Sequence, residues 1–267
     1  MITRPRQGQF CGEKLRGAFT LIELLVVLVI VAVLATLSVE VASNVRDGSD
    51  AARCVANLRQ LAAANLTYAS EHAGQFVPAQ EPENLIRWHG VRDGLAGKFD
   101  PTRGPLAAYL GEGRRVKTCP SLVRVLRGLA SFEDGTGGYG YNAAYIGGTP
   151  ADPFVAERIA NIPAPARVVM FADCAFPRAT GLQEYAFTEP YQWVDYRGRP
   201  RGALDPSTHF RHREHANVAW CDGHVTAERW SKLGGENRYN GSGKKWLIGW
   251  FGPQKDNGYW SPQATAP

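Results

Sequence analysis

The chain has 267 residues and a formal net charge of +5 at pH 7, with 44% hydrophobic and 21% charged residues. This composition is ordinary for a globular protein and excludes disordered and collagen-like chains. The positive charge is mild and no dense run of Lys and Arg carries it, so we expect no nucleic-acid partner.

The N-terminal segment, residues 1–18, is basic: its charged side chains are Arg4, Arg6, Glu13, Lys14 and Arg16. By the positive-inside rule this end stays in the cytoplasm and the C-terminal bulk of the chain is exported. The alternative interpretation is a cleavable secretory signal, which also begins with a basic region. The apolar run that follows is long for such a signal, and residues 32–35 are its nearest candidate cleavage site.

Residues 18–41 read AFTLIELLVVLVIVAVLATLSVEV, and they are almost unbroken aliphatic from Leu24 to Ser38. A helix rises about 1.5 Å per residue, so roughly 20 such residues cross a bilayer core. We therefore predict a single membrane span over about 19–41, in the inner (cytoplasmic) membrane. Glu23 lies inside this run, where an unpaired charge costs roughly 2.5–3.5 kcal/mol near the helix centre and less near its end.

The small residues Gly17 and Ala18, followed by Phe19 and then by Glu23, resemble the N-terminus of type IV prepilins and type II secretion pseudopilins. In that family a prepilin peptidase cleaves just before the Phe and methylates the new amine, and a Glu four residues beyond the Phe is the hallmark. The family usually has Gly directly before the cut, whereas this chain has Ala18. Cleavage after Ala18 preserves the Phe-to-Glu spacing and cleavage after Gly17 breaks it, so the resemblance implies a leader over residues 1–18.

Physical chemistry gives Glu23 a role in assembly. A buried carboxylate needs a counter-charge, and the new amine of a neighbouring subunit's Phe19 would supply one and fix the register of a helical assembly. The alternative is an ordinary anchor, in which Glu23 reaches the interface at the cytoplasmic end of the span.

After the span, residues 42–74 keep a helical pattern, with apolar side chains at three- and four-residue steps: Val55, Leu58, Leu61, Ala62, Leu66 and Ala69. Gly74 is a natural C-cap, so one long helix is predicted over 19–74. The stretch Asp47–Ser49 is its weak point, because a mid-helix Gly costs up to about 1 kcal/mol relative to Ala. A kink or local break is expected there, and the apolar stripe beyond it needs a β-sheet to pack against.

Residues 75–267 are predicted to form an exported, β-rich globular domain. Gly138–Asn142 alternates Gly with aromatic residues, which suits a twisted strand with its rings in the core. Arg167–Asp173 is typical of a short buried strand that ends in a carboxylate. The predicted fold is α+β and pilin-like: a long N-terminal helix, membrane-spanning in its first half, packed on a mainly antiparallel β-sheet.

Residues 217–228 give the clearest hairpin signal, with Asp222-Gly223 suited to a type I′ turn. His212 precedes Asp222-Gly223 by nine intervening residues. This segment, 212–223, resembles the H-X9-DG signature of a prepilin-processing-associated C-terminal domain. It matches the same class of protein as the N-terminus does, from the opposite end of the chain.

The exported part contains four cysteines, Cys54, Cys119, Cys174 and Cys221, while Cys11 lies in the leader. Disulfides are allowed outside the cytoplasm, and four cysteines admit three complete pairings. Buried reduced thiols are the other interpretation. No C-x-x-C pair is present, so a zinc ribbon is not indicated.

His209, His212 and His215 are spaced by three, and histidines on one helix face can share a metal. Cationic residues interrupt this cluster and no H-E-x-x-H motif is present, so we predict no metal site. We expect His212 to hold the loop before the hairpin by hydrogen bonds to Asp173 or Asp222. Calcium bound by loop carboxylates stays an open alternative.

Asp173 and Asp222 are the candidate pair of catalytic carboxylates. Both lie at strand ends, where turn-capping aspartates are also found. The sequence contains no nucleophile or nucleotide-binding motif, so we predict neither enzymatic activity nor a cofactor.

The C-terminal segment 244–251 is unusually aromatic, and Tyr259 and Trp260 follow it. Aromatic side chains dominate burial, which favours a final strand or loop that closes the core. The alternative is a platform for a sugar or a protein partner.

Together these features predict a structural subunit of a type IV pilus or a type II secretion pseudopilus, major or minor. Its partners would be prepilin peptidase, sibling subunits and the inner membrane. The alternative is a membrane-anchored extracytoplasmic binding module, directed toward carbohydrate, that uses the pilin-like N-terminus only for export.

Overall fold

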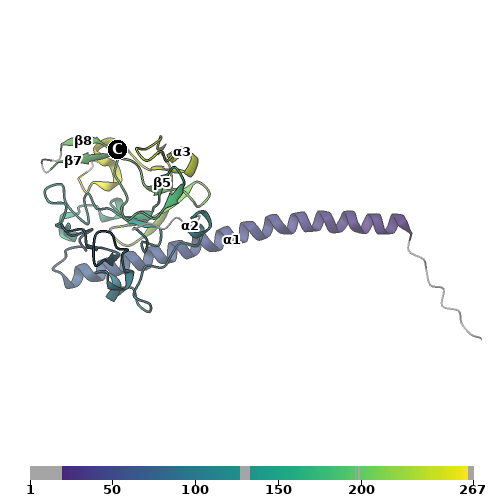
Figure 1. Cartoon of the computed structure of the whole chain (residues 1–267), viewed down its shortest axis with the longest axis horizontal. Coiled ribbons are helices and arrows are strands. Elements are labelled where there is room, and N and C mark those ends of the chain that lie inside the picture. Colours follow the sequence, from purple (N-terminus) through teal and green to yellow (C-terminus); the bar gives the residue numbers. More distant parts are fainter. Residues whose placement is uncertain (1–19, 127–132, 196, 198, 264–267) are drawn as a thin grey trace, which may run out of the picture. The chain divides into compact units, whose positions relative to one another are not determined.

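Figure 1 shows the computed structural model, which describes residues 20–126, 133–195, 197 and 199–263. These residues fall into two units, one ending at Arg46 and the other, a globular unit, beginning at Asp47. Helix α1 (Leu21–Glu71) begins in the first unit and ends in the second.

The remaining elements belong to the globular unit. Its helices are α2 (Pro120–Val125), α3 (Gly243–Trp246) and the 3-10 helices η1 (Pro101–Arg103), η2 (Ala107–Tyr109), η3 (Ile159–Asn161), η4 (Pro165–Arg167) and η5 (Lys255–Trp260). Its strands are β1 (Ile86–Arg87), β2 (Gly90–Val91), β3 (Tyr139–Tyr141), β4 (Val169–Asp173), β5 (Phe176–Arg178), β6 (Gly181–Gln183), β7 (Gln192–Val194), β8 (Pro200–Ala203), β9 (Thr208–His209), β10 (His215–Trp220), β11 (Val225–Arg229), β12 (Lys232–Leu233) and β13 (Ile248–Trp250).

The central sheet has the strand order β11-β10-β4-β3, and each neighbouring pair is antiparallel. Strands β12, β13 and β9 form a second antiparallel sheet, and three strand pairs (β1-β2, β5-β6 and β7-β8) complete the described sheets. The predicted α+β class, a long N-terminal helix followed by antiparallel sheets, is confirmed.

The C-terminal half of α1 packs against the central sheet with the stripe that its periodicity predicts. Its buried side chains, Cys54, Leu58, Leu61, Ala62 and Ala69, join one core cluster with Tyr139, Tyr141, Met170 and Phe171 from β3 and β4. The amides of Asn57 and Asn65 donate to the hydroxyls of Tyr139 and Tyr141, each over 3.1 Å. Polar side chains of the helix therefore satisfy the tyrosine hydroxyls that the strand buries.

The opposite face of the central sheet is buried as well. Along β10, Ala216, Val218 and Trp220 belong to a second core cluster, whereas Ala219 belongs to the cluster beneath α1. This alternation is the two-residue period of a strand. The second cluster is completed by the C-terminal segment, including Trp250, Phe251 and Trp260, so the sheet lies between α1 and the end of the chain.

Of the kink or local break expected at Asp47–Ser49, the break is absent, because α1 is helical at all three positions. An ideal Cβ on Gly48 would meet nothing within 4 Å, so the residue is a glycine on an open face of the helix. Arg124 of α2 lies 3.0 Å from Asp47 and 2.6 Å from Asp50. These two ion pairs hold the helix where its intrinsic propensity is weak.

Helix α1 ends at Glu71, three residues before the predicted end at 74. Ala73, not Gly74, is the first left-handed residue, with φ of 53°, and Gly74 follows with φ of 79°. The N–H of Gly74 donates to Ala69 O at 2.8 Å, which is the long hydrogen bond of a Schellman cap.

The predicted hairpin is present as β10 and β11, but its turn type is wrong. Trp220 N donates to His224 O at 3.0 Å, so the loop between them consists of Cys221, Asp222 and Gly223. Gly223 N donates to Trp220 O at 2.9 Å, and among these three residues only Gly223 has a positive φ, of 92°. This is a three-residue loop with a left-handed Gly, not a type I′ turn. The type I′ conformation occurs instead at Arg213 and Glu214, whose φ values are 52° and 64°.

A disulfide joins Cys54 of α1 to Cys119 at the start of α2, across 65 residues of sequence. Their Cα atoms are 5.3 Å apart, within the usual range for a disulfide. Cys174 and Cys221 are free and buried. The four cysteines of the globular unit thus divide between the two interpretations that the sequence leaves open.

We expect loss of this disulfide to lower the free energy of unfolding by about 2–4 kcal/mol, because the bridge restricts the unfolded chain. Urea unfolding of the full chain in detergent, with and without dithiothreitol, checks this. A Cys174→Ala/Cys221→Ala chain should keep the dependence on reductant, and a Cys54→Ser/Cys119→Ser chain should lose it. Equal stability of the oxidised and reduced protein would contradict the prediction.

Candidate functional site

The described part of α1 begins beside the predicted processing site. Gly17, Ala18 and Phe19 lie outside the described residues, and Thr20 is the first residue within them. The backbone N–H and the hydroxyl of Thr20 donate to Glu23 Oε2 over 2.9 and 2.8 Å, and Glu23 N donates back to Thr20 Oγ1 over 3.3 Å. This reciprocal pair is a capping box, which satisfies N–H groups that a helix start leaves without partners.

Leu21–Ser38 is long and apolar enough to cross a bilayer, with a mean hydropathy of 2.9. Its Leu, Ile and Val side chains are between 49% and 82% exposed. A continuous apolar surface of this length requires cover by lipid or by other apolar helices.

The H-X9-DG residues bracket β10. The nine residues between His212 and Asp222 are the Arg213-Glu214 turn, the six residues of β10, and Cys221. His212 N and His215 O are 3.0 Å apart and His215 N and His212 O are 3.1 Å apart, so His212 closes the first turn. Asp222 and Gly223 form the second turn, where Asp222 Oδ1 lies 2.6 Å from His224 Nδ1. The spacing of the motif is thus the length of one strand and its two turns.

A buried ionic network around Asp173, the last residue of β4, holds the first of these turns. Asp173 Oδ1 accepts from Arg211 Nη2 at 2.5 Å. Oδ2 accepts from the backbone and side-chain nitrogens of Asn217, at 2.7 and 3.0 Å, and lies 3.3 Å from His212 Nε2. Of the two partners that the sequence suggests for His212, the structure therefore selects Asp173.

Arg211 extends the network to three further segments. Its Nη2 donates to Gly138 O over 2.8 Å, Nη1 to Cys174 O over 3.3 Å, and Nε contacts Cys119 Sγ at 3.2 Å. The side chain is 3% exposed, and its carboxylate partner is fully buried. Through Cys119 the network also reaches the disulfide and hence α1.

These contacts change the pKa values of two side chains, Asp173 and His209. Burial alone would raise the pKa of Asp173, but the Arg211 guanidinium and the hydrogen bonds from His212 and Asn217 outweigh it and hold this pKa below its usual value. Burial, reinforced by Arg211, lowers the pKa of His209 well below its usual value. His209 is therefore a neutral imidazole beside a charged guanidinium.

The three spaced histidines do not share a helix face. His209 ends β9, His212 lies in the network, and His215 begins β10 with Nδ1 2.8 Å from Arg213 O. Among the described residues, the group with metal-ligand spacing is Cys54, Cys119 and His212. Its two sulfurs are joined as a disulfide, and metals bind thiolates, so this group does not fit a metal ion.

The two candidate catalytic carboxylates lie at opposite ends of β4. Asp173 ends the strand, whereas Asp222 follows Cys221, whose N–H donates to Val168 O just before the strand begins. A pair separated by the length of a strand cannot act on one bond.

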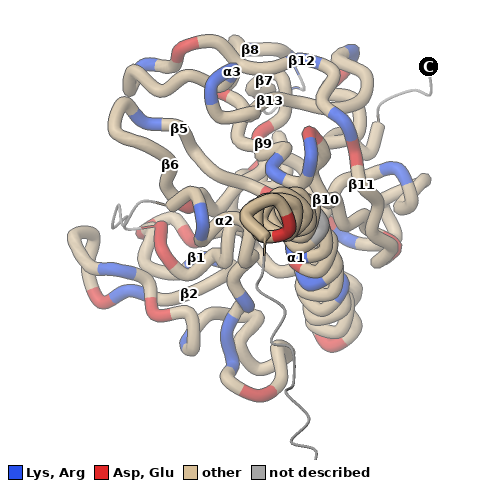
Figure 2. The backbone as a smooth tube through the Cα atoms, turned by 90° about the vertical axis from the view of Figure 1, so that its right-hand side faces the viewer, with Lys and Arg blue, Asp and Glu red and all other residues tan. Residues whose placement is uncertain are grey.

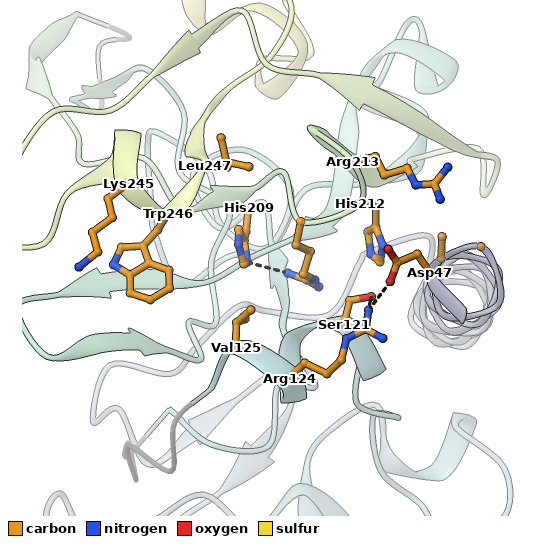
Figure 3. Close-up of a pocket in the computed structure, with 13 residues that line it drawn as sticks. Asp47, Ser121, Arg124, Val125, His209, His212, Arg213, Lys245, Trp246 and Leu247 are labelled. Carbon is orange, nitrogen blue, oxygen red and sulfur yellow. Dashed lines mark hydrogen bonds and ion pairs between the residues drawn. The ribbon is translucent and has the colours of Figure 1, made fainter. Parts of the chain in front are cut away.

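A cavity of about 410 Å³ lies beside the network (Figure 3). Its wall includes Asp47 and Ala51 of α1, Arg124 of α2, His209 and the segment from Arg211 to Arg213, and Lys245 to Leu247. In Figure 3, Lys245 and Trp246 lie at one end of the labelled side chains, Asp47 and Arg213 lie at the other, and His209 lies between them.

The aromatic C-terminal segment is turned inward, as the core-packing interpretation predicts. Trp250 stacks on Tyr191 with ring centroids 5.1 Å apart and donates to Pro190 O over 3.1 Å. Trp260 is fully buried and donates to Thr188 O over 3.0 Å. Within segment 244–251, Trp246 is the aromatic residue that lines a described cavity.

Residues 14–39 match the family model of the prokaryotic N-terminal methylation motif. The match covers the predicted cleavage site and the apolar helix, and it indicates a membrane-anchored, prepilin-like substrate of prepilin peptidase. Such proteins are typically structural subunits without enzymatic activity. No curated protein and no solved structure is significantly similar to the chain.

Sequence reasoning missed Arg211 and Asn217 as the main partners of Asp173. One signal for them is present: Asp173 ends a strand of apolar residues, and a buried carboxylate requires a cation. Arg211, next to the motif histidine, was the cation to test. The cavity had no signal of this kind, because its wall comes from four segments that are distant in sequence.

We expect Asp173→Asn to lower the free energy of unfolding by about 3–5 kcal/mol, because it leaves the buried Arg211 without its counter-charge. Urea unfolding of the full chain in detergent at pH 7 measures this. Asp222→Asn is the control: its carboxylate is partly exposed and contacts His224, and a loss below about 1 kcal/mol is expected.

The loss of stability caused by Asp173→Asn should depend on pH. Because the folded-state pKa of Asp173 lies below the unfolded value, its stabilising contribution is complete above about pH 4 and is lost as the pH falls through the folded pKa. The gap between the wild-type chain and Asp173→Asn should therefore narrow on acidification. A gap that stays constant down to pH 2 would contradict the proposed cause.

Proposed function

We propose that this chain is a pilin-like structural subunit of a type IV pilus or a type II secretion pseudopilus. The match of residues 14–39 to the N-terminal methylation motif carries this proposal. The exposed apolar half of α1 supports it, because pilin-like subunits bury such a surface first in the membrane and then among sibling helices. The H-X9-DG spacing around β10 adds support from the exported part.

In this proposal residues 1–18 are a cytoplasmic leader, residues 19–74 a long helix, and residues 75–267 an exported domain. Prepilin peptidase cleaves between Ala18 and Phe19 and methylates the new amine. The basic leader keeps the N-terminus in the cytoplasm, so the globular unit lies on the periplasmic or extracellular side.

Glu23 is the proposed assembly residue. Both donors of Thr20 bond to the same oxygen, Oε2, which leaves Oε1 for an ammonium group. The mature Phe19 amine of a neighbouring subunit would pair with it inside the apolar bundle. A buried ion pair is a good device for fixing register, because each misaligned position leaves a charge unpaired.

The second candidate is a membrane-anchored binding module, which the cavity beside Trp246 favours. The version of this hypothesis in which the C-terminal aromatic residues form a platform for carbohydrate loses support, because Trp250, Phe251 and Trp260 are buried. The two candidates differ in whether Glu23 matters once the chain is in the membrane.

The mature chain is expected to begin at methylated Phe19 when it is made in cells that contain a prepilin peptidase, and at Met1 in cells without one. Intact mass and N-terminal sequencing of the purified full-length product measure this. A chain beginning at Ala18 would move the site to Gly17–Ala18. An unprocessed chain in both hosts would leave an ordinary anchored protein and would favour the binding module.

Glu23→Ala is expected to abolish assembly while the globular unit stays folded, because it removes the proposed counter-charge of the Phe19 amine. The yield of sheared filaments, or of subunit cross-links where the assembly is short, measures this in the native host. Glu23→Gln is the matched control: it keeps an acceptor for Thr20 and removes only the charge. Loss in both variants supports ion pairing, loss in Ala alone indicates helix capping, and no loss in either supports the binding module.

A further inference from the structure

The group formed by Cys54, Cys119 and His212 is not used by the proposed assembly mechanism, and it has a second chemical state. In the oxidised chain the two sulfurs are joined, so they offer a metal ion no thiolate. A disulfide forms from two thiols, however, so a reduced chain precedes the oxidised one. In that reduced chain the group consists of two cysteines and one histidine, which are the side-chain types that zinc prefers.

The ligand atoms of this group are already close together. The two sulfurs and a ring nitrogen of His212 lie within 4.8 Å of one another, and Cys119 Sγ is 3.7 Å from His212 Nε2. Zinc binds sulfur at about 2.3 Å and nitrogen at about 2.0–2.1 Å, so the edge between S and N in a tetrahedral zinc site is about 3.6 Å long. Cys119 and His212 are therefore placed as two corners of such a site.

Cys54 can reach the same ion. Its Cα atom is 5.3 Å from that of Cys119, so the two side chains enter one space. Two thiolates on one zinc ion lie about 3.8 Å apart, so these side chains have only to turn away from each other when no bond joins them. In two views at right angles (Figure 1 and Figure 2) α2 lies beside α1, so the ion would connect the same two helices as the disulfide does.

The surroundings of the group are those of a metal site. Cys54 and Cys119 are fully buried, and the side chain of His212 is 7% exposed. Arg211 Nε contacts Cys119 Sγ at 3.2 Å, and contacts of this kind orient the ligands of a metal ion. His212 also lines the cavity of Figure 3, from which a water molecule can take the fourth position, as in other zinc sites with three protein ligands.

Zinc would compete with Asp173 for His212 Nε2, and the contact that it would replace is a long one. Nε2 and Asp173 Oδ2 are 3.3 Å apart. Asp173 keeps its shorter hydrogen bonds from Arg211, at 2.5 Å, and from Asn217, at 2.7 and 3.0 Å. The buried carboxylate therefore stays compensated when the lone pair of Nε2 faces the metal and the ring proton is on Nδ1.

We propose that Cys54, Cys119 and His212 bind Zn²⁺ in the reduced chain, and that oxidation of the two cysteines expels the ion. On binding, one Zn²⁺ replaces the protons of the two thiols. A disulfide oxidant such as oxidised glutathione then takes two electrons from the two thiolates and two protons from water, becoming two thiols, while the Cys54–Cys119 bond forms and Zn²⁺ leaves. Helices α1 and α2 are thereby cross-linked in both states, first by the metal and then by the disulfide.

The sequence contains no sign of this site, because its ligands come from three distant segments. Cys54 and Cys119 are 65 residues apart, and Cys119 and His212 are 93 residues apart. Zinc motifs that are recognised in a sequence have paired ligands about two to five residues apart. The missing C-x-x-C pair therefore excludes a zinc ribbon but not this group.

Native mass spectrometry of the full chain in dodecyl maltoside tests the proposal, with Zn²⁺ as the probe. One sample is kept reduced with a phosphine and stripped of metal, and an oxidised sample of the same chain is the control. The reduced chain should gain one zinc ion and lose two protons, whereas the oxidised chain should gain none. Oxidised glutathione should then release one zinc ion for each disulfide formed, measured with a colorimetric chelator.

Variants identify the ligands. His212→Ala should weaken zinc binding by at least about tenfold, because it removes the nitrogen ligand. His224→Ala is the matched control, since this histidine lies beyond the second turn and outside the group, and it should bind zinc as the wild-type chain does. Cys54→Ser/Cys119→Ser should bind none. Unchanged affinity in His212→Ala would contradict the proposed site.

A reduced wild-type chain that binds no zinc would overturn the proposal, and so would equal binding by the oxidised chain. Loss of zinc in Cys174→Ala/Cys221→Ala would place the ion at the two free thiols and would also overturn it. Where Cys54→Ser/Cys119→Ser does not fold, the oxidised wild-type sample still decides the question, because its sequence is unchanged. The three ligands belong to the globular unit, so failure here leaves the filament proposal standing.

Discussion

The buried Asp173 carboxylate is the group on which the architecture of the globular unit depends. It lies at the end of a fully buried strand, where an uncompensated charge would cost several kcal/mol. Arg211, His212 and Asn217 compensate it, and Arg211 also reaches Gly138, the residue before β3, and Cys119. One charge thus fixes the relative positions of β3, β4, β10 and the start of α2.

The same network explains why a strained turn persists next to His212. Arg213 and Glu214 both have positive φ, which costs roughly 1–2 kcal/mol for each residue with a side chain. The turn is held on one side by the paired backbone of His212 and His215, and on the other by the hydrogen bonds of Asn217 to Asp173. Strain at a position fixed by its surroundings is a frequent feature of binding sites, and Arg213 of this turn lines the cavity shown in Figure 3.

The sequence was sufficient for features set by local periodicity. The stripe of α1 and strand β10 followed from the spacing of apolar residues, because one face of α1 and both faces of β10 are buried. The apolar span followed from the length of its aliphatic run. The sequence was insufficient where a distant residue decides the local conformation. Gly48 stays helical because Arg124, far along the chain, pairs with Asp47 and Asp50. The type I′ turn occurs at Arg213-Glu214 and not at Asp222-Gly223 because tertiary contacts override turn propensity. The pairing of Cys54 with Cys119 required the three-dimensional distance between α1 and α2.

The disulfide has a mechanical consequence. If the chain is the filament subunit that we propose, any pull from the membrane or from neighbouring subunits reaches the globular unit along α1. The load enters the globular unit at Asp47, and seven residues later it meets a covalent bond at Cys54. Beyond that bond, tension is shared between α1 and α2, and through Arg211 it is passed to the central sheet. Because of this disulfide, a force along α1 cannot separate the helix from the sheet one turn at a time. Helices α1 and α2 and the sheet have to be extended together.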